Sequence, residues 1–210
     1  MMAGTVSEGE RAVMEIRGSS VMLASVLALP LMFCQPVAFA ASDSTQALAE
    51  TAVDQQSFTL ALEKAEAGDA KAQYDVARFY QTGKGIAPDH AKAVEWLVKA
   101  AEQGLMEAET SLGSAYDLGM GVPISNQKAV YWWQKAAKQG SGFALRCLGY
   151  SYIEGRGVAQ NNLYAYVVWK HLPADDAEAM DVLKALRKNL SAEETAKGDR
   201  MTLDEVFQSR

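Results

Sequence analysis

Cysteine and histidine are scarce in this chain of 210 residues, which contains Cys34 and Cys147 and the histidines His90 and His171. No spacing of these residues matches a zinc site, and a His-Glu-x-x-His motif is absent. Catalysis by a histidine needs a nucleophile and an orienting group around it, and no motif in the chain supplies them. The sequence therefore predicts no catalytic residue, no metal and no cofactor.

The chain also lacks an excess of basic residues. Lysine and arginine together number 20 against 26 aspartates and glutamates, which gives a net charge of -6. A nucleic-acid partner needs a clustered basic surface to meet its phosphates. The charge balance therefore argues against nucleic acid as a partner, whereas 49% hydrophobic residues are ordinary for a folded globular protein.

The apolar run near the N-terminus is too short to cross a membrane. It covers 13 residues, Val21–Phe33, whereas a transmembrane helix needs about 20. Its length, the preceding Arg17 and the small residues Ala38 and Ala40 are typical of a cleavable signal peptide. We expect residues 1–40 to be removed after Ala40, which leaves a periplasmic or secreted protein without a transmembrane span.

This end of the chain has alternative interpretations. An uncleaved membrane anchor is one, and a start at Met14 in place of Met1 is another, because residues 1–13 make a poor signal-peptide beginning. The bulky Phe33 before Cys34 excludes a lipoprotein signal. Cleavage would leave Cys147 as the sole cysteine, so no intramolecular disulfide can form. Residues 41–56 are small and polar at first, and we expect them to form a flexible leader.

Residues 57–172 are dominated by an internal repeat of 36 residues. Six positions carry the same residue in three successive units. They are Gly68/Gly104/Gly140, Ala72/Ala108/Ala144, Tyr80/Tyr116/Tyr152, Gly83/Gly119/Gly155, Gly85/Gly121/Gly157 and Ala93/Ala129/Ala165. Coincidence does not explain six such columns.

Each unit is predicted to form two helices. Apolar residues follow helical spacing at Ala72, Val76, Ala77 and Tyr80, and again around Leu97 in the second half of the unit. The tryptophans of the second helices keep this spacing, so we interpret them as core residues and not as platforms for ligand stacking. They are Trp96, Trp132, Trp133 and Trp169.

The Gly-x-Gly pairs mark the turn between the two helices of a unit. Glycine can end a helix with a positive φ angle at no steric cost. Four residues beyond each pair stand Asp89, Ser125 and Asn161, which share only their ability to cap a helix N-terminus. These pairs lie between helices and recur three times, so a phosphate-binding loop is not expected.

The ends of the repeat array are predicted to differ from its middle. Phe58–Ala67 aligns with a second helix and would form an N-terminal half-repeat. Ala174–Leu190 is another helical stretch, and a capping box at Ser191 opens a further helix. We therefore expect capping helices over residues 173–210, since the end of a solenoid must present a polar face.

The units resemble the Sel-one-like repeat, a relative of the tetratricopeptide repeat. The resemblance rests on Ala-Lys-Ala-Gln-Tyr (70–74), Gly-Lys-Gly-Ile (83–86), Lys-Ala-Val-Glu-Trp (92–96) and Lys-Ala-Ala-Glu-Gln-Gly (99–104). The third unit matches to Ala165 and then departs. The resemblance implies an all-α, right-handed α-solenoid of about three units plus terminal helices, and a non-catalytic adaptor or scaffold that binds a protein or peptide in the bacterial envelope.

The resemblance also implies where a partner would bind, because first helices line the concave face of tetratricopeptide-like solenoids. The residues that would face this groove come in three sets one repeat apart. They are Tyr74, Arg78 and Gln81; Thr110, Ser114 and Asp117; and Arg146, Tyr150 and Ile153. Tyrosine and arginine dominate interface hot spots, so we expect binding to centre on Arg146 and Tyr150. The alternative, left open here, is that the helix beginning near Ala174 covers both residues.

Two further functions remain as alternatives. The protein could bind a cell-wall glycan or an exopolysaccharide in place of a protein. A β-lactam-binding or -hydrolysing activity, described for cysteine-rich relatives, is disfavoured because those proteins carry a cysteine pair in each repeat and this chain has one cysteine in all its repeats.

Overall fold

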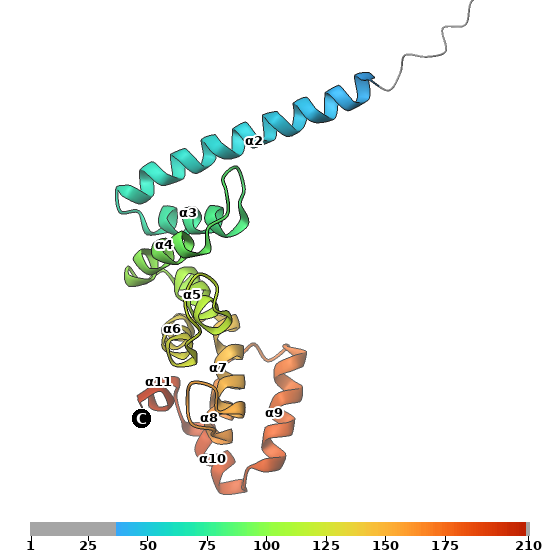
Figure 1. Ribbon diagram of the computed structural model, residues 1–210. Coiled ribbons are helices and arrows are strands. Elements are labelled where there is room, and N and C mark those ends of the chain that lie inside the picture. The colour runs from blue at the N-terminus through green and yellow to red at the C-terminus, as the bar shows by residue number, and fades with distance from the viewer. Residues whose placement is uncertain (1–36, 209–210) are drawn as a thin grey trace, which may run out of the picture. The chain divides into compact units, whose positions relative to one another are not determined.

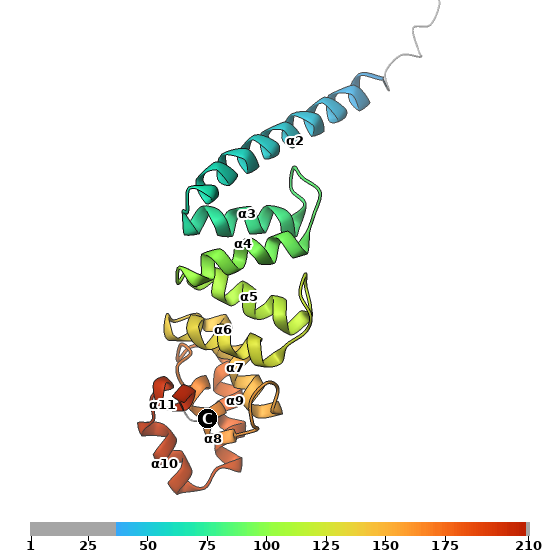
Figure 2. The same ribbon diagram turned by 60° about the vertical axis from the view of Figure 1, so that its left-hand side comes forward.

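The computed structural model describes residues 37–208, which form ten helices, α2–α11, and no strand (Figure 1 and Figure 2). The predicted all-α class is confirmed. The apolar segment expected to belong to a signal peptide, residues 21–33, lies outside the described residues, as does Met14.

Three helix pairs form the predicted repeat units. They are α3 (Ala70–Thr82) with α4 (His90–Glu102), α5 (Met106–Leu118) with α6 (Asn126–Lys138), and α7 (Gly142–Glu154) with α8 (Asn162–Trp169). Each helix packs against the next along the chain, and Figure 2 shows the loops of the first two units on the same side of the stack. The 36-residue period therefore sets both the helix boundaries and their stacking.

The loop between paired helices has the predicted chemistry. Gly83 ends α3 with a φ angle of 71°, a conformation that side chains other than glycine rarely adopt. The side chain of Asp89 then accepts a hydrogen bond from the backbone N–H of Lys92 and caps α4. Ser125 and Asn161 cap α6 and α8 in the same way.

The second glycine of each Gly-x-Gly pair serves a different purpose. A Cβ atom at Gly121 would overlap the backbone of His90 and lie 2.8 Å from the nitrogen of Ala91, at the start of the preceding second helix. Gly85 approaches the backbone of Asp54 in the same way, since a Cβ atom there would lie 2.7 Å from the Asp54 carbonyl carbon. These glycines therefore let successive units come into backbone contact.

The N-terminal half-repeat is confirmed within helix α2 (Val37–Glu66). Asp54 stands 36 residues before His90, and Glu66, the last residue of α2, stands 36 before the last residue of α4. Phe58 and Leu62 of this segment pack against Val76 of α3. The C-terminal part of α2 thus acts as the second helix of an incomplete unit.

Residues 41–56 are helical, where the sequence predicted a flexible leader. They belong to the continuous helix α2, which has neither glycine nor proline between Val37 and Glu66. Alanine, glutamine and glutamate favour helices, and the packed C-terminal part provides a nucleus from which the helix extends. Helix propensity therefore outweighs the polarity of this segment.

In the core of the stack, small residues of the first helices pack against large residues of the second helices. In the first unit Ala77 and Leu97 are fully buried together. One repeat on, these positions hold Gly113 and Trp133, and a Cβ atom at Gly113 would lie 3.0 Å from Cε2 of the Trp133 ring and closer still to two other ring atoms. The large ring fits because the facing residue has no side chain.

The third unit has the same pairing of glycine and tryptophan in Gly149 and Trp169. A Cβ atom at Gly149 would lie 2.6 Å from the Cδ1 atom of the Trp169 indole. Trp133 and Trp169 are buried, as expected of core residues. Trp96 and Trp132 are only half-buried, and the ammonium groups of Lys99 and Lys135 lie 3.9 and 4.7 Å from their ring centroids. The core interpretation holds fully for two of the four tryptophans.

The C-terminal helices complete the stack as a degenerate fourth unit. Helix α9 (Ala177–Asn189) has the length of α7 and buries Ala179, which follows the buried Ala144 by 35 residues. Helices α10 (Ala192–Arg200) and α11 (Leu203–Gln208) also contact α8. The capping box at Ser191 is confirmed. Only two residues separate α9 from α10, so this unit lacks the Gly-x-Gly loop.

Candidate functional site

The first helices of successive units form a surface with two hollows. The middle hollow has a volume of about 420 Å³ and draws its lining from α3, α5 and α7 and from two residues near the inter-helix loops. Its lining residues are Gln81, His90, Thr110, Ser111, Ser114, Met120 and Phe143. Three of the nine predicted groove residues, Gln81, Thr110 and Ser114, therefore meet at one place.

A second hollow of about 620 Å³ lies between α2 and α3 and includes the predicted groove residue Arg78. We call it the N-terminal hollow. Its lining residues are Asp54, Ser57, Ala61, Asp75, Arg78, Phe79, Thr82 and Lys84. Four of its positions recur in the middle hollow one repeat later, as Asp54/His90, Asp75/Ser111, Arg78/Ser114 and Lys84/Met120. The two hollows are thus the same structural position with different chemistry, charged in the first and mostly neutral in the second.

The position occupied by Tyr74, Thr110 and Arg146 joins neighbouring units. The hydroxyl of Thr110 lies 3.1 Å from the hydroxyl of Ser141, the residue that caps α7. Arg146 makes an ion pair with Asp176, the residue that caps α9. Tyr74 is half-buried against the core of the first two units. This column therefore contributes more to holding units together than to an open binding surface.

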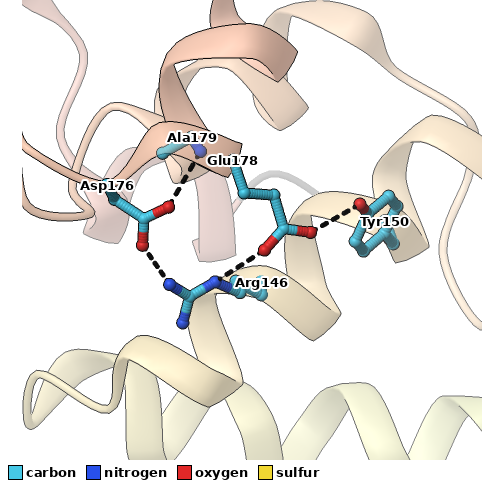
Figure 3. Close-up of polar contacts among 5 residues, drawn as sticks. All are labelled: Arg146, Tyr150, Asp176, Glu178 and Ala179. Atoms are coloured by element: carbon cyan, nitrogen blue, oxygen red, sulfur yellow. Dashed lines mark hydrogen bonds and ion pairs between the residues drawn. The ribbon is translucent and has the colours of Figure 1, made fainter.

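Arg146 and Tyr150 are engaged by the first turn of α9 (Figure 3). The Nε atom of Arg146 donates a hydrogen bond to one carboxylate oxygen of Glu178 at 3.1 Å, and the Tyr150 hydroxyl donates to the other at 2.9 Å. The Tyr150 ring also packs edge-on against Trp169, with 5.2 Å between centroids. The hydrogen bond to Glu178 and partial burial raise the pKa of Tyr150.

These contacts correspond to the second interpretation of the sequence, in which the C-terminal helices cover this end of the face. The physical reason is charge: the first turn of α9 places two carboxylates beside the guanidinium of Arg146. Tyr150 nevertheless keeps 37% of its surface exposed, so binding at Arg146 and Tyr150 stays a prediction. Because the polar ends of both side chains already have partners, we place the centre of the candidate site in the middle hollow.

Asp117 and Ile153, the last predicted groove residues of the second and third sets, also contact other parts of the protein. Asp117 is mostly buried and pairs with Arg156 at 3.6 Å. Ile153 is half-buried against the core of the third unit. Helical spacing alone could not show that these two side chains pack against other parts of the protein.

Phe143 is the residue of the middle hollow that sequence reasoning missed. It stands on the first turn of α7 with 54% of its surface exposed. Lys71 and Glu107 occupy its position in the other units. The sequence therefore does contain a signal, namely an aromatic residue at a position that is charged and faces solvent in the other units. An exposed aromatic beside a hollow is typical of a protein interface.

Cys147 and His171 are both engaged by their surroundings. Burial raises the pKa of the Cys147 thiol to about 11, and the neighbouring Asp117 adds to this effect. His171 uses its Nδ1 atom in a contact of 2.7 Å to the carbonyl of Val167. Within residues 37–208, no group of three or more histidines, cysteines or carboxylates is placed to hold a metal ion.

Glu109 of α5 is a buried carboxylate that the sequence analysis did not single out. It is 2% exposed and accepts a hydrogen bond of 2.7 Å from the side-chain amide of Gln139, with the Lys135 ammonium 3.9 Å away. Burial raises the pKa of Glu109, and these two neighbours offset part of the effect. The same position in the first unit holds Gln73, bonded to Gln103 at 2.8 Å, so the site joins the first helix of a unit to the end of its second helix and is structural.

Comparison with known proteins agrees with this architecture. The family model for the Sel1 repeat matches residues 70–105, 107–141 and 144–166. The chain contains three Sel1 repeats. The third match ends beside Ala165, where the sequence pattern also departs. Sel1 repeats generally mediate protein–protein interaction, and the fold is typically a non-catalytic module.

Two solved structures resemble this Sel1-repeat protein. One is a protective antigen present in uropathogenic Escherichia coli strains that displays an SLR fold, with a TM-score of 0.61 and 30% identity over 69% of this chain and 31% of that chain. The other is a Sel1 repeat protein from Oxalobacter formigenes, with a TM-score of 0.55 and 27% identity over 66% of each chain. This chain thus spans about a third of the first relative and 66% of the second.

A search of curated proteins gives no match to the sequence. Among the helices of residues 37–208, none combines the length and the hydrophobicity that a membrane crossing requires.

Proposed function

We propose that this Sel1-repeat protein is an exported adaptor that binds a segment of a partner protein in the middle hollow of its first-helix face. The observation that carries the proposal is the combination of a hollow of about 420 Å³ with the exposed Phe143 at its edge. Exposed aromatic rings beside pockets are frequent anchors of protein interfaces. The repeat family supports a protein partner.

The lining of the middle hollow suits a peptide segment. Thr110, Ser111 and Ser114 offer small hydroxyl side chains, and Met120 and Phe143 offer adaptable apolar surface. The hydroxyl of Ser114 already donates to the carbonyl of Thr110 at 3.2 Å, so its oxygen can still accept a hydrogen bond from a ligand. The hollow can therefore bury an apolar side chain and satisfy the polar backbone next to it.

Export is part of the proposal and rests on the N-terminal sequence. The apolar run 21–33 and the small residues before Ala41 support a cleaved signal peptide. Sequencing of the N-terminus from the cell envelope should find Ala41 first. Envelope protein that retains residues 1–40 would contradict export with cleavage.

Photocrosslinking in cells tests the binding surface. Benzoylphenylalanine would replace Phe143 in the hollow or, as a matched control, Tyr131 on α6, whose exposure is 52% against 54% for Phe143. We expect a discrete crosslinked partner from position 143 and none of it from position 131. The further change Ser114→Arg, which fills the hollow, should abolish the product. Equal products at both positions, or a product insensitive to Ser114→Arg, would refute the proposed surface.

A further inference from the structure

The N-terminal hollow contains one positive charge without a partner among the described residues. Asp54 pairs with Lys84 at 3.0 Å, and Asp75 pairs with Lys71 at 3.1 Å. The guanidinium of Arg78 lines the same hollow, is exposed, and has no carboxylate or hydrogen-bond acceptor within residues 50–208. Both carboxylates of the hollow thus already pair with a lysine, whereas Arg78 has no partner among these residues.

The third unit shows how this column of the face binds a carboxylate. Arg78 and Tyr150 occupy the same position two repeats apart. Tyr150, together with Arg146, holds the carboxylate of Glu178 from the first turn of α9 (Figure 3). The chain therefore already uses this position for an acidic side chain supplied by another segment, at the end where its own C-terminal helices provide one.

The next hollow along the face has different chemistry. The position equivalent to Arg78 is Ser114, and that equivalent to Lys84 is Met120, with Phe143 at the edge. A segment that lies along the first helices would meet a cation at one unit and an uncharged, largely apolar hollow at the next. Two different neighbouring sites can impose a register on a bound segment.

We propose that the partner segment is acidic: one of its carboxylates binds Arg78, and an apolar side chain at a fixed spacing enters the middle hollow. This inference rests on the proposed function and adds the chemistry of the partner. Arginine suits the role because its planar guanidinium can bind a carboxylate through two hydrogen bonds. The pair lies at an exposed edge, so salt weakens it, and the apolar contact is the part that persists at high ionic strength.

Selection from a displayed library of random nonapeptides tests the inference on the full chain. The variants are Arg78→Gln, which removes the charge in the hollow, and Arg200→Gln, which removes an exposed arginine of α10 as a matched control. Ser114→Arg blocks the middle hollow, and Phe143→Ala shortens its edge. Circular dichroism melts establish that each variant is folded.

We expect the wild type and Arg200→Gln to select peptides with an Asp or Glu at a constant distance from an apolar residue. Arg78→Gln should lose the acidic preference and bind the best wild-type peptide about two- to fivefold more weakly at 50 mM salt, with a smaller difference at 0.5 M. Ser114→Arg and Phe143→Ala should lose the apolar preference.

The outcomes separate the two proposals. Selected peptides that depend on Ser114 and Phe143 but show no acidic preference, or the same preference with Arg78→Gln, would overturn the inference and leave the proposed function standing. Selected peptides that are indifferent to Ser114→Arg and Phe143→Ala, or no enrichment at all, would overturn both.

Discussion

The exchange of small and large residues between Gly113 and Trp133 makes a quantitative prediction. The single change Gly113→Ala places a Cβ atom 3.0 Å from one atom of the Trp133 ring and closer to two others, whereas carbon atoms pack best about 3.5–4.0 Å apart. The ring is 2% exposed and has little room to move. Overpacking of this kind costs about 1–3 kcal/mol, and the better helix propensity of alanine returns about 1 kcal/mol. We expect Gly113→Ala to lower the free energy of unfolding by about 0–2 kcal/mol.

The second single change, Trp133→Leu, removes the clash partner but leaves a cavity. We expect it to cost about 2–4 kcal/mol, less than the roughly 3–5 kcal/mol for truncation of a core aromatic to alanine, because leucine keeps part of the buried side chain. The double variant recreates the Ala77/Leu97 pair of the first unit, which is fully buried. The double variant should therefore lose less stability than the sum of the losses of the two single variants, by about 1–3 kcal/mol.

Urea unfolding followed by circular dichroism measures all four proteins, since fluorescence would lose a reporter with Trp133. Ala77→Gly is the matched control: it removes a Cβ atom at the same position of a unit that carries leucine, and should cost about 1 kcal/mol from helix propensity and about 1 kcal/mol from the lost burial of the methyl group. Additivity of the two substitutions within about 0.5 kcal/mol would show that Gly113 and Trp133 do not depend on each other, and would refute the packing argument.

Three further outcomes follow from the polar groups. Burial raises the pKa of Glu109, so its charged form destabilises the fold, and this loss of stability grows as the pH rises from the ordinary pKa of a glutamate through the raised pKa. Glu109→Gln should therefore raise the urea midpoint at pH 7 and reduce the decline in stability between pH 4 and 7. An unchanged pH profile would contradict this. With a pKa of about 11, Cys147 should resist iodoacetamide at pH 8 in the folded protein and react in urea; rapid native alkylation would contradict its burial. Arg146→Ala should lower the free energy of unfolding by about 1 kcal/mol and speed hydrogen exchange in α9 but not in α3. An equal change in the exchange rates of both helices would show that the ion pairs of Arg146 do not hold α9.

The repeat makes the fold predictable from sequence. A period of 36 residues, small and large apolar residues at helical spacing, and capping residues such as Asp89 are local signals, and each reports a conformation that neighbouring residues decide. The half-repeat before Ala67 and the capping box at Ser191 are visible for the same reason. The helix over residues 41–56 escapes prediction although its propensity is local, because small polar residues fit a leader as well as an exposed helix.

The binding face needs the tertiary structure. Arg146 and Tyr150 have the composition of a hot spot, but whether they are open depends on α9, which reaches them from about 30 residues away. Phe143 and Ser114 line one hollow only because the stack brings parts of α5 and α7 to the same place, and Arg78 is free only because Lys84 and Lys71 pair with the nearby carboxylates. Sequence periodicity predicted which side of each first helix would face a groove. Contacts between units, which depend on distances between residues far apart in the chain, decided which of those side chains a partner can reach.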